Sequence, residues 1–357
     1  MPLELPPNTE LVSLVFTLTP QKTSTIFPQY TVGLHAWFLD VVRQTNPELS
    51  QHLHDEQTEK PFTISTLEGE ITSVGKRLQL QSQHTYYWYL SVFSPPLVRW
   101  LGDWLRNLPA TVHLRQAPLQ INSVEFAQTP TTYEKLSKFK SRRNLCLSFV
   151  TPTSFRRKKH HFPLPLPVNV FHSYLRRWQN FAPRKFDQEA FLVWVDEHVL
   201  LTRHQIESVK VAAGKRGSVT GFVGAVEYSL SASASSQPEY VQLYKTLIHF
   251  APYCGTGHKT TFGLGQTRLG WLNKAGSLDA LMGEHQLAQR IEEVTTQLMQ
   301  QQKRTGGTRA LKVCQTRATI FARHEWGESL KDIALDLDMP YETVKTYSKL
   351  ARKGLGK

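Results

Sequence analysis

The feature of this sequence that most restricts its fold is an order of predicted strands and helices that occurs twice along the chain. In the first half, an apolar run at 11–18 predicts a buried strand, and residues 32–45 carry apolar side chains at helical spacing. Two short strand candidates, an aromatic strand, an amphipathic helix and an extended segment follow at 62–67, 70–73, 85–93, 97–108 and 112–127. The order β-α-β-β-α-β is typical of a ferredoxin-like domain.

The second half of the chain has the same order of elements. Its predicted strands lie at 145–150, 200–211, 218–230 and 267–271, and its predicted helices lie at 168–181 and 239–250. Two tandem halves fit this pattern better than a single large sheet. We therefore expect an α+β protein with two tandem ferredoxin-like (βαββαβ) domains, at residues 1–135 and 136–275.

Residues 276–357 differ in character and predict an all-α tail. Four helices are expected there, at 281–302, 309–324, 328–338 and 341–353. The last two have helix-turn-helix spacing, with the small Ala334 at a close-packed position, Leu337 and Met339 beside the turn, and Val344 in the next helix. Asp338 stands where a turn glycine is usual, and it tolerates the left-handed conformation at some cost. A plain helical hairpin is the alternative.

The charge balance predicts a polyanionic partner. The 357-residue chain has 42 Lys and Arg against 29 Asp and Glu, a net charge of +13 and a pI near 9.6. Three isolated cysteines argue against a zinc ribbon or a disulfide framework and favour a reducing compartment. With no signal-peptide pattern and no apolar run near the ~20 residues of a membrane span, we expect a soluble cytoplasmic protein.

A glycine-rich loop at 255–265 predicts a backbone that comes close to a charged group. It contains Gly255, Gly257, Gly263 and Gly265, with His258 and Lys259 between them. Glycine permits positive φ and close approach, so its amide groups can reach a phosphate. The spacing fits neither a P-loop nor a dinucleotide-binding fingerprint. The alternative is a helix C-terminus followed by a flexible turn.

Two basic segments are further candidates for contact with a polyanion. The first is a linker between the halves, and the second is a loop at 155–161 whose alternative interpretation is a solvated surface. Their candidate side chains are Arg142, Arg143, Arg156, Arg157, Lys158 and Lys159.

Several segments, taken in order, resemble one family. They are residues 33–39, 46–54, Lys60 with 62–65, 149–155 and the glycine-rich loop. Together they resemble the endoribonucleases that cleave CRISPR repeat RNA into guide RNAs, within the superfamily of repeat-associated RNA-binding proteins. The resemblance covers roughly residues 10–272 and does not include the tail.

The resemblance implies a reaction without a metal or cofactor. The 2′-OH of the repeat attacks the adjacent phosphate and leaves a 2′,3′-cyclic phosphate, and the product stays bound. Such a reaction needs a base, an acid and a positive group at the phosphorane. The resemblance places His54 as general acid or base and Lys60 as the group that stabilises the phosphate. His35 on the first helix is the second histidine candidate, although a buried histidine is an equally good interpretation.

Two rival functions remain at this point. One is a non-catalytic RNA-binding subunit of a CRISPR effector, and the other is a DNA-binding regulator that acts through the helix-turn-helix. The expected partners are CRISPR repeat RNA, with other effector subunits and DNA at the tail as further candidates, and no membrane.

Overall fold

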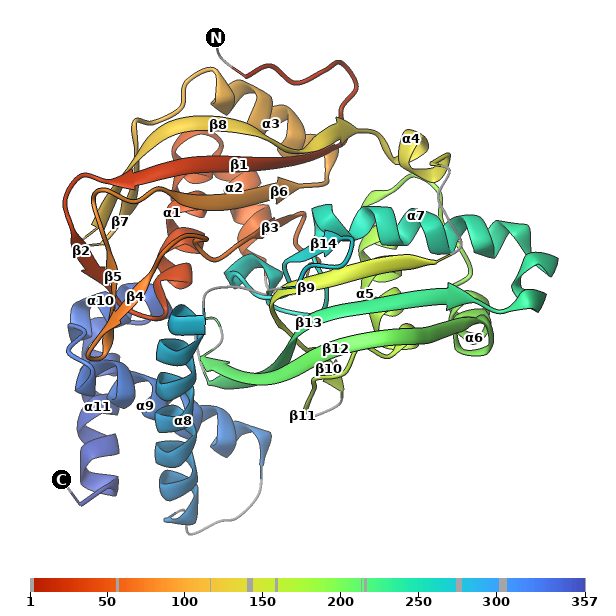
Figure 1. The fold of residues 1–357 in the computed structure, drawn as a ribbon. Coiled ribbons are helices and arrows are strands. Elements are labelled where there is room, and N and C mark those ends of the chain that lie inside the picture. Colours follow the sequence, from red (N-terminus) through yellow and green to blue (C-terminus); the bar gives the residue numbers. More distant parts are fainter. Residues whose placement is uncertain are drawn as a thin grey trace.

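The computed structural model describes residues 3–356 apart from several short gaps. The gaps are 56–57, 116, 140–143, 158–159, 213, 215–216, 274–277 and 302–306. Figure 1 shows two sheet-containing domains side by side, with a group of helices packed beneath them.

The first domain contains a five-stranded antiparallel sheet in the order β3-β6-β1-β8-β7. Its strands are β1 (Leu11–Pro20), β3 (Phe62–Ile64), β6 (Tyr86–Val92), β7 (Thr111–Leu114) and β8 (Ala117–Thr131). Helices α1 (Tyr30–Thr45) and α3 (Pro95–Leu105) pack on one face, where Phe38 and Trp104 join a core with Phe16 and Trp88 of the sheet. The predicted β-α-β-β-α-β order is confirmed.

Two further features of this domain differ from the prediction. The strand expected at 70–73 is β4 (Thr72–Val74), which pairs with β5 (Arg77–Leu80) in a separate small sheet and not in the main one. Strand β2 (Ser24–Ile26) completes that small sheet. An additional helix, α2 (Pro47–His54), follows α1; the Asn46 side chain caps it by accepting the Leu49 N–H.

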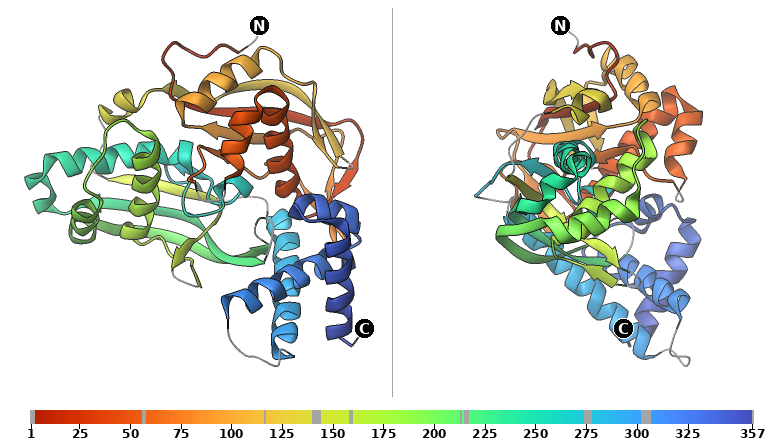
Figure 2. Two further views of the ribbon diagram at one scale, coloured as in Figure 1. Left: turned by 180° about the vertical axis from the view of Figure 1, so that it is seen from behind. Right: turned by 90° about the vertical axis from the view of Figure 1, so that its right-hand side faces the viewer.

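The second domain has a four-stranded antiparallel sheet in the order β12-β13-β9-β14. The strands are β9 (Leu145–Thr153), β12 (Val199–Ala212), β13 (Ser218–Leu230) and β14 (Thr267–Leu269). Helices α5 (Pro167–Phe181) and α7 (Pro238–Cys254) cover one face, as the view from behind in Figure 2 shows. This domain repeats the ferredoxin-like order, so the predicted α+β fold with two tandem domains is confirmed.

Smaller elements complete the second half. They are α4 (Tyr133–Ser137), α6 (Gln188–His198), two 3-10 turns η1 (Ala232–Ser236) and η2 (Thr260–Phe262), and a hairpin of β10 (Phe155–Arg157) and β11 (His160–Phe162). The hairpin occupies part of the segment where a basic loop was expected. Helix α6 was not predicted.

The two domains share an apolar interface. Phe93, just after β6, is fully buried and belongs to the core of the second domain. Its ring lies 5.3 Å from that of Phe181 and 5.8 Å from that of Phe250. Because burial of a phenylalanine side chain contributes about 2 kcal/mol, Phe93 stabilises the contact between the two domains.

The tail is all-α, as predicted, and packs against both domains. It contains α8 (Leu278–Gln300), α9 (Thr308–Glu325), α10 (Leu330–Leu337) and α11 (Tyr341–Gly354). Helix α8 packs against β12 and contacts β4 and β5 of the small sheet. Ala334 and Val344 are buried, and Asp338 has φ 53° and ψ 53°, so the predicted left-handed turn between α10 and α11 is confirmed.

Candidate functional site

The glycine-rich loop after α7 lies between the two domains. Gly263 forms a parallel β-bridge with Ser65, which follows β3 of the first domain. A side chain at Gly263 would lie 3.0 Å from the methyl group of Thr31 on α1. The turn η2 in the middle of the loop also packs on α1 and β3. The loop therefore joins the second domain to the part of the first domain that carries the candidate catalytic residues.

Two glycines of the loop are required by the approach of the chain to itself. A Cβ at Gly257, where φ is 79°, would lie 2.3 Å from the carbonyl oxygen of Ser154. A Cβ at Gly265, where φ is 70°, would lie 1.9 Å from the carbonyl oxygen of Thr256. Contacts this short exclude any side chain, so these glycines are explained by packing of the protein backbone.

The amides of three loop glycines are already used inside the protein. The N–H groups of Gly255, Gly257 and Gly265 donate respectively to Ala251 O, Ser173 Oγ and Pro152 O. The expectation that these three amides are available to a phosphate is therefore wrong for this conformation. The loop is held by internal hydrogen bonds, and within 255–265 only His258, Lys259 and Phe262 are partly exposed.

A buried arginine fixes the carbonyl groups of the same loop. Arg177 of α5 is 2% exposed and donates to Gly257 O at 2.7 Å and to Ser173 Oγ at 2.8 Å. Its Nε lies 3.2 Å from Oε1 of Glu59, which belongs to the first domain. A buried guanidinium requires such a set of acceptors, because an unpaired charge in the interior is costly. Arg177 thus connects the loop to a carboxylate of the other domain.

The two candidate catalytic residues lie at the end of α2 and two residues before β3. His54 is exposed at the last position of α2. Lys60 is half-buried, and its Nζ donates to Asp55 O. Between them, Glu59 forms an ion pair with Arg176 at 2.9 Å in addition to its pair with Arg177. Helix α5 therefore holds Glu59, the residue directly before Lys60.

His35 lies against the glycine-rich loop. Its side chain is 8% exposed, and its Nδ1–H donates to Thr261 O at 2.8 Å. The ring also stacks on Phe262 with a centroid distance of 4.2 Å. The structure brings His35 into the domain interface, where its ring supports the loop.

His258 and Lys259 differ in what they can offer a phosphate. His258 donates its Nδ1–H to Ser154 O at 2.8 Å and stacks on His161, and burial lowers its pKa to about 4. It is therefore neutral near pH 7. Lys259 has a left-handed backbone with φ 61°, and burial, together with the charge of Arg156, lowers its pKa to about 8. Lys259 still carries its charge near neutral pH.

The basic hairpin β10–β11 stands next to this loop. Arg156 and Arg157 are exposed and lie opposite His161 and His160 across the hairpin. The other predicted cations lie outside the described residues: Arg142, Arg143, Lys158 and Lys159.

Sequence analysis missed Arg177 and Glu59. A signal for Arg177 was present, because it lies four residues after Ser173 and seven after Val170, on the buried face of α5. A cation on the apolar face of an amphipathic helix predicts a buried partner. No pattern in the sequence pointed to Glu59 as that partner.

Metal-binding clusters and membrane-spanning helices are both absent from the part of the chain that the structure describes. No group of three or more His, Cys, Asp or Glu side chains is arranged there to hold a metal ion. In the same part of the chain, none of the helices combines the length and the apolar character needed to cross a lipid bilayer.

Two ferredoxin-like domains joined through a glycine-rich loop define a class of RNA-processing proteins, and comparison with protein families agrees. The model described as "CRISPR Cas6 N-terminal domain" matches residues 11–145, and the model described as "CRISPR-associated endoribonuclease Cas6" matches residues 147–267. The chain belongs to the Cas6 family of endoribonucleases, which process CRISPR repeat RNA. Both matches end before the helical tail.

Individual relatives are distant in sequence. A CRISPR-associated endoribonuclease Cas6 of Streptococcus thermophilus is 22% identical over 242 residues, which are 67% of this chain and 90% of the relative. A solved Cas6 product complex is 27% identical with a TM-score of 0.56, and the match covers 73% of this chain and 99% of that one. Cas6 from Thermus thermophilus, at 23% identity and a TM-score of 0.54 over 74% of this chain and 100% of that one, has a similar fold.

Proposed function

We propose that this protein cleaves CRISPR precursor RNA within its repeats by a metal-independent reaction. The 2′-OH next to the cut attacks the phosphate, which leaves a 2′,3′-cyclic phosphate and a 5′-OH. His54 acts as general acid or base, and Lys60 stabilises the negative charge that develops on the phosphorane. Histidine suits either proton role near neutral pH, and lysine supplies a compact charge.

The observation that supports this proposal is the ion pair of Glu59, the residue directly before Lys60, with Arg177 of the second domain. Arg177 also holds the loop that contains Lys259. The exposed Arg156 and Arg157 on the neighbouring hairpin add positive charge for an RNA backbone. In this proposal an RNA that contacts these cations also reaches Lys60 and His54.

His35 has a different part in this proposal. Because its ring is buried and its Nδ1–H is donated to Thr261 O, His35 acts as a positioning residue that supports the loop. The proton transfers then depend on His54, with Lys60 and water as the neighbouring donors. In the same proposal the cleaved repeat stays bound, and the 27% identical Cas6 whose structure is a product complex supports this.

The test uses end-labelled repeat RNA in EDTA under single-turnover conditions. We expect the wild type to cut, and His54→Ala to slow cleavage by roughly 10²- to 10⁴-fold. His52→Ala is the matched control, because His52 is an exposed histidine on the same helix. A single 2′-deoxy nucleotide on the 5′ side of the cut is expected to abolish the reaction.

Two results would contradict the proposal. Cleavage that requires Mg²⁺ and tolerates the 2′-deoxy substitution would show a different mechanism. Absence of cutting by the wild type on any repeat RNA, with tight binding retained, would favour a non-catalytic RNA-binding subunit.

A further inference from the structure

The last three helices of the tail form a compact unit. Ile320 of α9, Ile333 and Leu337 of α10 and Val344 of α11 pack together, and each is buried. The turn at Asp338 lets Met339 N–H bond to Ala334 O, so α10 ends sharply and α11 starts in a new direction. This is the arrangement of a helix-turn-helix, in which α11 occupies the place of the recognition helix.

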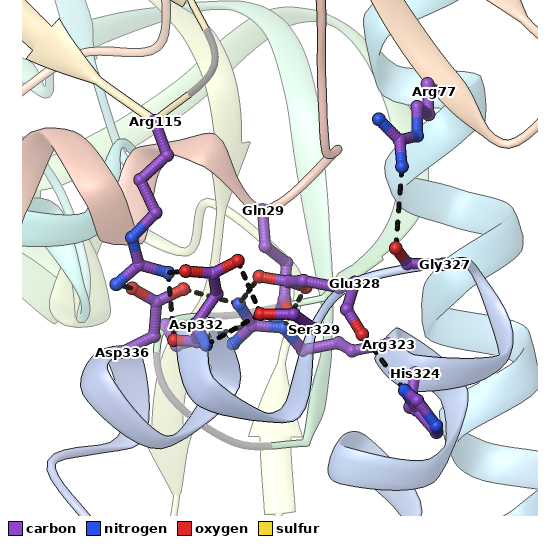
Figure 3. A network of polar contacts seen from close by, with 11 residues as sticks. Gln29, Arg77, Arg115, Arg323, His324, Gly327, Glu328, Ser329, Asp332 and Asp336 are labelled. Carbon is purple, nitrogen blue, oxygen red and sulfur yellow. Dashed lines mark hydrogen bonds and ion pairs between the residues drawn. The ribbon is translucent and has the colours of Figure 1, made fainter.

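A buried ionic cluster fixes the angle between α9 and α10. Arg323 of α9, which is 2% exposed, pairs with Glu328 and with Asp336 of α10. From the first domain, Arg115 lies 2.8 Å from Asp336 and also pairs with Asp332, as Figure 3 shows. The carboxylates of α10 are therefore neutralised by cations of the protein itself, and the same contacts attach the unit to the first domain.

Helix α11 carries positive charge on its outer face, in contrast to the carboxylates of α10. Lys345, Lys349, Arg352 and Lys353 are exposed there, while Glu342 is the single carboxylate of the helix. Helix α11 packs mainly on α8, α9 and α10. Figures 1 and 2 show α11 at the outer edge of the molecule. A cationic helix face held outward by a rigid unit is complementary to a polyanion.

We propose that α11 binds the major groove of duplex DNA, as a function additional to RNA cleavage. A helix fits the major groove of B-form DNA, which is about 12 Å wide, whereas the major groove of A-form RNA is too deep and narrow for side chains to read. In such a complex Tyr341 and Thr346, exposed in the first half of α11, meet base edges, and the lysines contact phosphates. The nuclease is then tethered to DNA through a part of the chain that lies outside both Cas6 matches.

The test measures binding of the full-length protein to a labelled DNA duplex of mixed sequence and to an RNA duplex of the same sequence. We expect tighter binding to the DNA duplex. The double variant Lys345→Ala/Lys349→Ala is expected to bind DNA about tenfold more weakly and to reduce the slope of log K against log salt by about 2. Its cleavage of repeat RNA is expected to equal that of the wild type, which separates this proposal from the proposed nuclease mechanism.

The double variant Lys135→Ala/Lys138→Ala is the matched control, because both are exposed lysines in or next to α4, away from the tail. It also removes two charges and is expected to leave DNA binding unchanged. Equal or tighter binding to duplex RNA, or DNA binding that the double variant does not weaken while its unfolding midpoint is unchanged, would overturn the proposal.

Discussion

Arg177 of the second domain lies 3.2 Å from Glu59 of the first, and the same guanidinium donates to the carbonyl group of Gly257 in the glycine-rich loop. Glu59 directly precedes Lys60. The Arg177 side chain therefore sets the position of Glu59 and Lys60 relative to the loop that contains Lys259.

Glu59→Gln tests this positioning role. Loss of the carboxylate charge frees the segment from α5, so we expect the single-turnover cleavage rate to fall by roughly ten- to a hundredfold while the Kd for repeat RNA changes little. Glu59→Asp should recover part of the rate. Glu239→Gln, which removes an exposed carboxylate paired with Arg184, is the control and should cleave normally. Equal losses of affinity and rate would show that Glu59 serves RNA binding instead.

The lowered pKa of Lys259 should make RNA binding depend on pH. Because burial and Arg156 lower its pKa to about 8, it is charged in free and bound protein below pH 8, and affinity should be constant there. Above pH 8 the free protein loses the proton, whereas a bound phosphate favours the charged form. The affinity for a 2′-deoxy, uncleavable repeat should then fall by up to about tenfold per pH unit. In Lys259→Arg the affinity should no longer fall above pH 8. If the affinity of the wild type and of this variant changed with pH in the same way, a phosphate contact of Lys259 would be contradicted.

Glu284 predicts a pH dependence of stability. It is 6% exposed where α8 packs on the first domain, and burial raises its pKa to about 8. Below about pH 4.5 the Glu284 carboxyl is protonated in both the folded and the unfolded chain. Between pH 4.5 and 8 this carboxyl ionises only in the unfolded chain. The protein therefore becomes less stable as the pH rises through that window. In denaturant titrations at pH 8, the free energy of unfolding of Glu284→Gln should therefore exceed that of the wild type by roughly 4 kcal/mol. At pH 4.5 the two proteins should have nearly equal stability. Glu293→Gln, an exposed site on the same helix, should show no such difference.

Asp338 predicts a gain in stability from glycine. Its φ of 53° places an L-residue in the left-handed region, where glycine has no strain. Asp338→Gly should stabilise the tail by about 1 kcal/mol in denaturant titrations, and Asp338→Ala should destabilise it. A loss of stability in the glycine variant would mean that the aspartate side chain makes a contact of its own.

Local sequence patterns predicted much of the fold. The apolar runs of β1 and β6 and the periodic faces of α1, α3, α5 and α7 are strong signals, because each element buries one face in a core. The turn at Asp338 was predicted from the helix-turn-helix spacing of Ala334 and Val344 around it. Helix α2 was missed, although Asn46 followed by Pro47 is a typical helix start.

The candidate site was harder to predict than the fold. His54 and Lys60 came from resemblance alone, and their roles stay a proposal. The glycines were expected to let the backbone approach a charged group, but the groups that approach Gly257 and Gly265 are Ser154 O and Thr256 O of the protein itself. The pair of Arg177 with Glu59 joins distant parts of the chain, and only the packing of the two domains brings them together.

The internal hydrogen bonds of the glycine-rich loop have a consequence for the thermodynamics of RNA binding. Because Gly255, Gly257 and Gly265 are bonded within the protein, the loop has a defined conformation before RNA arrives. A preorganised loop loses little conformational entropy when a ligand binds. The protein therefore offers the RNA a surface that is already formed, and ordering of this loop adds little to the entropic cost of association.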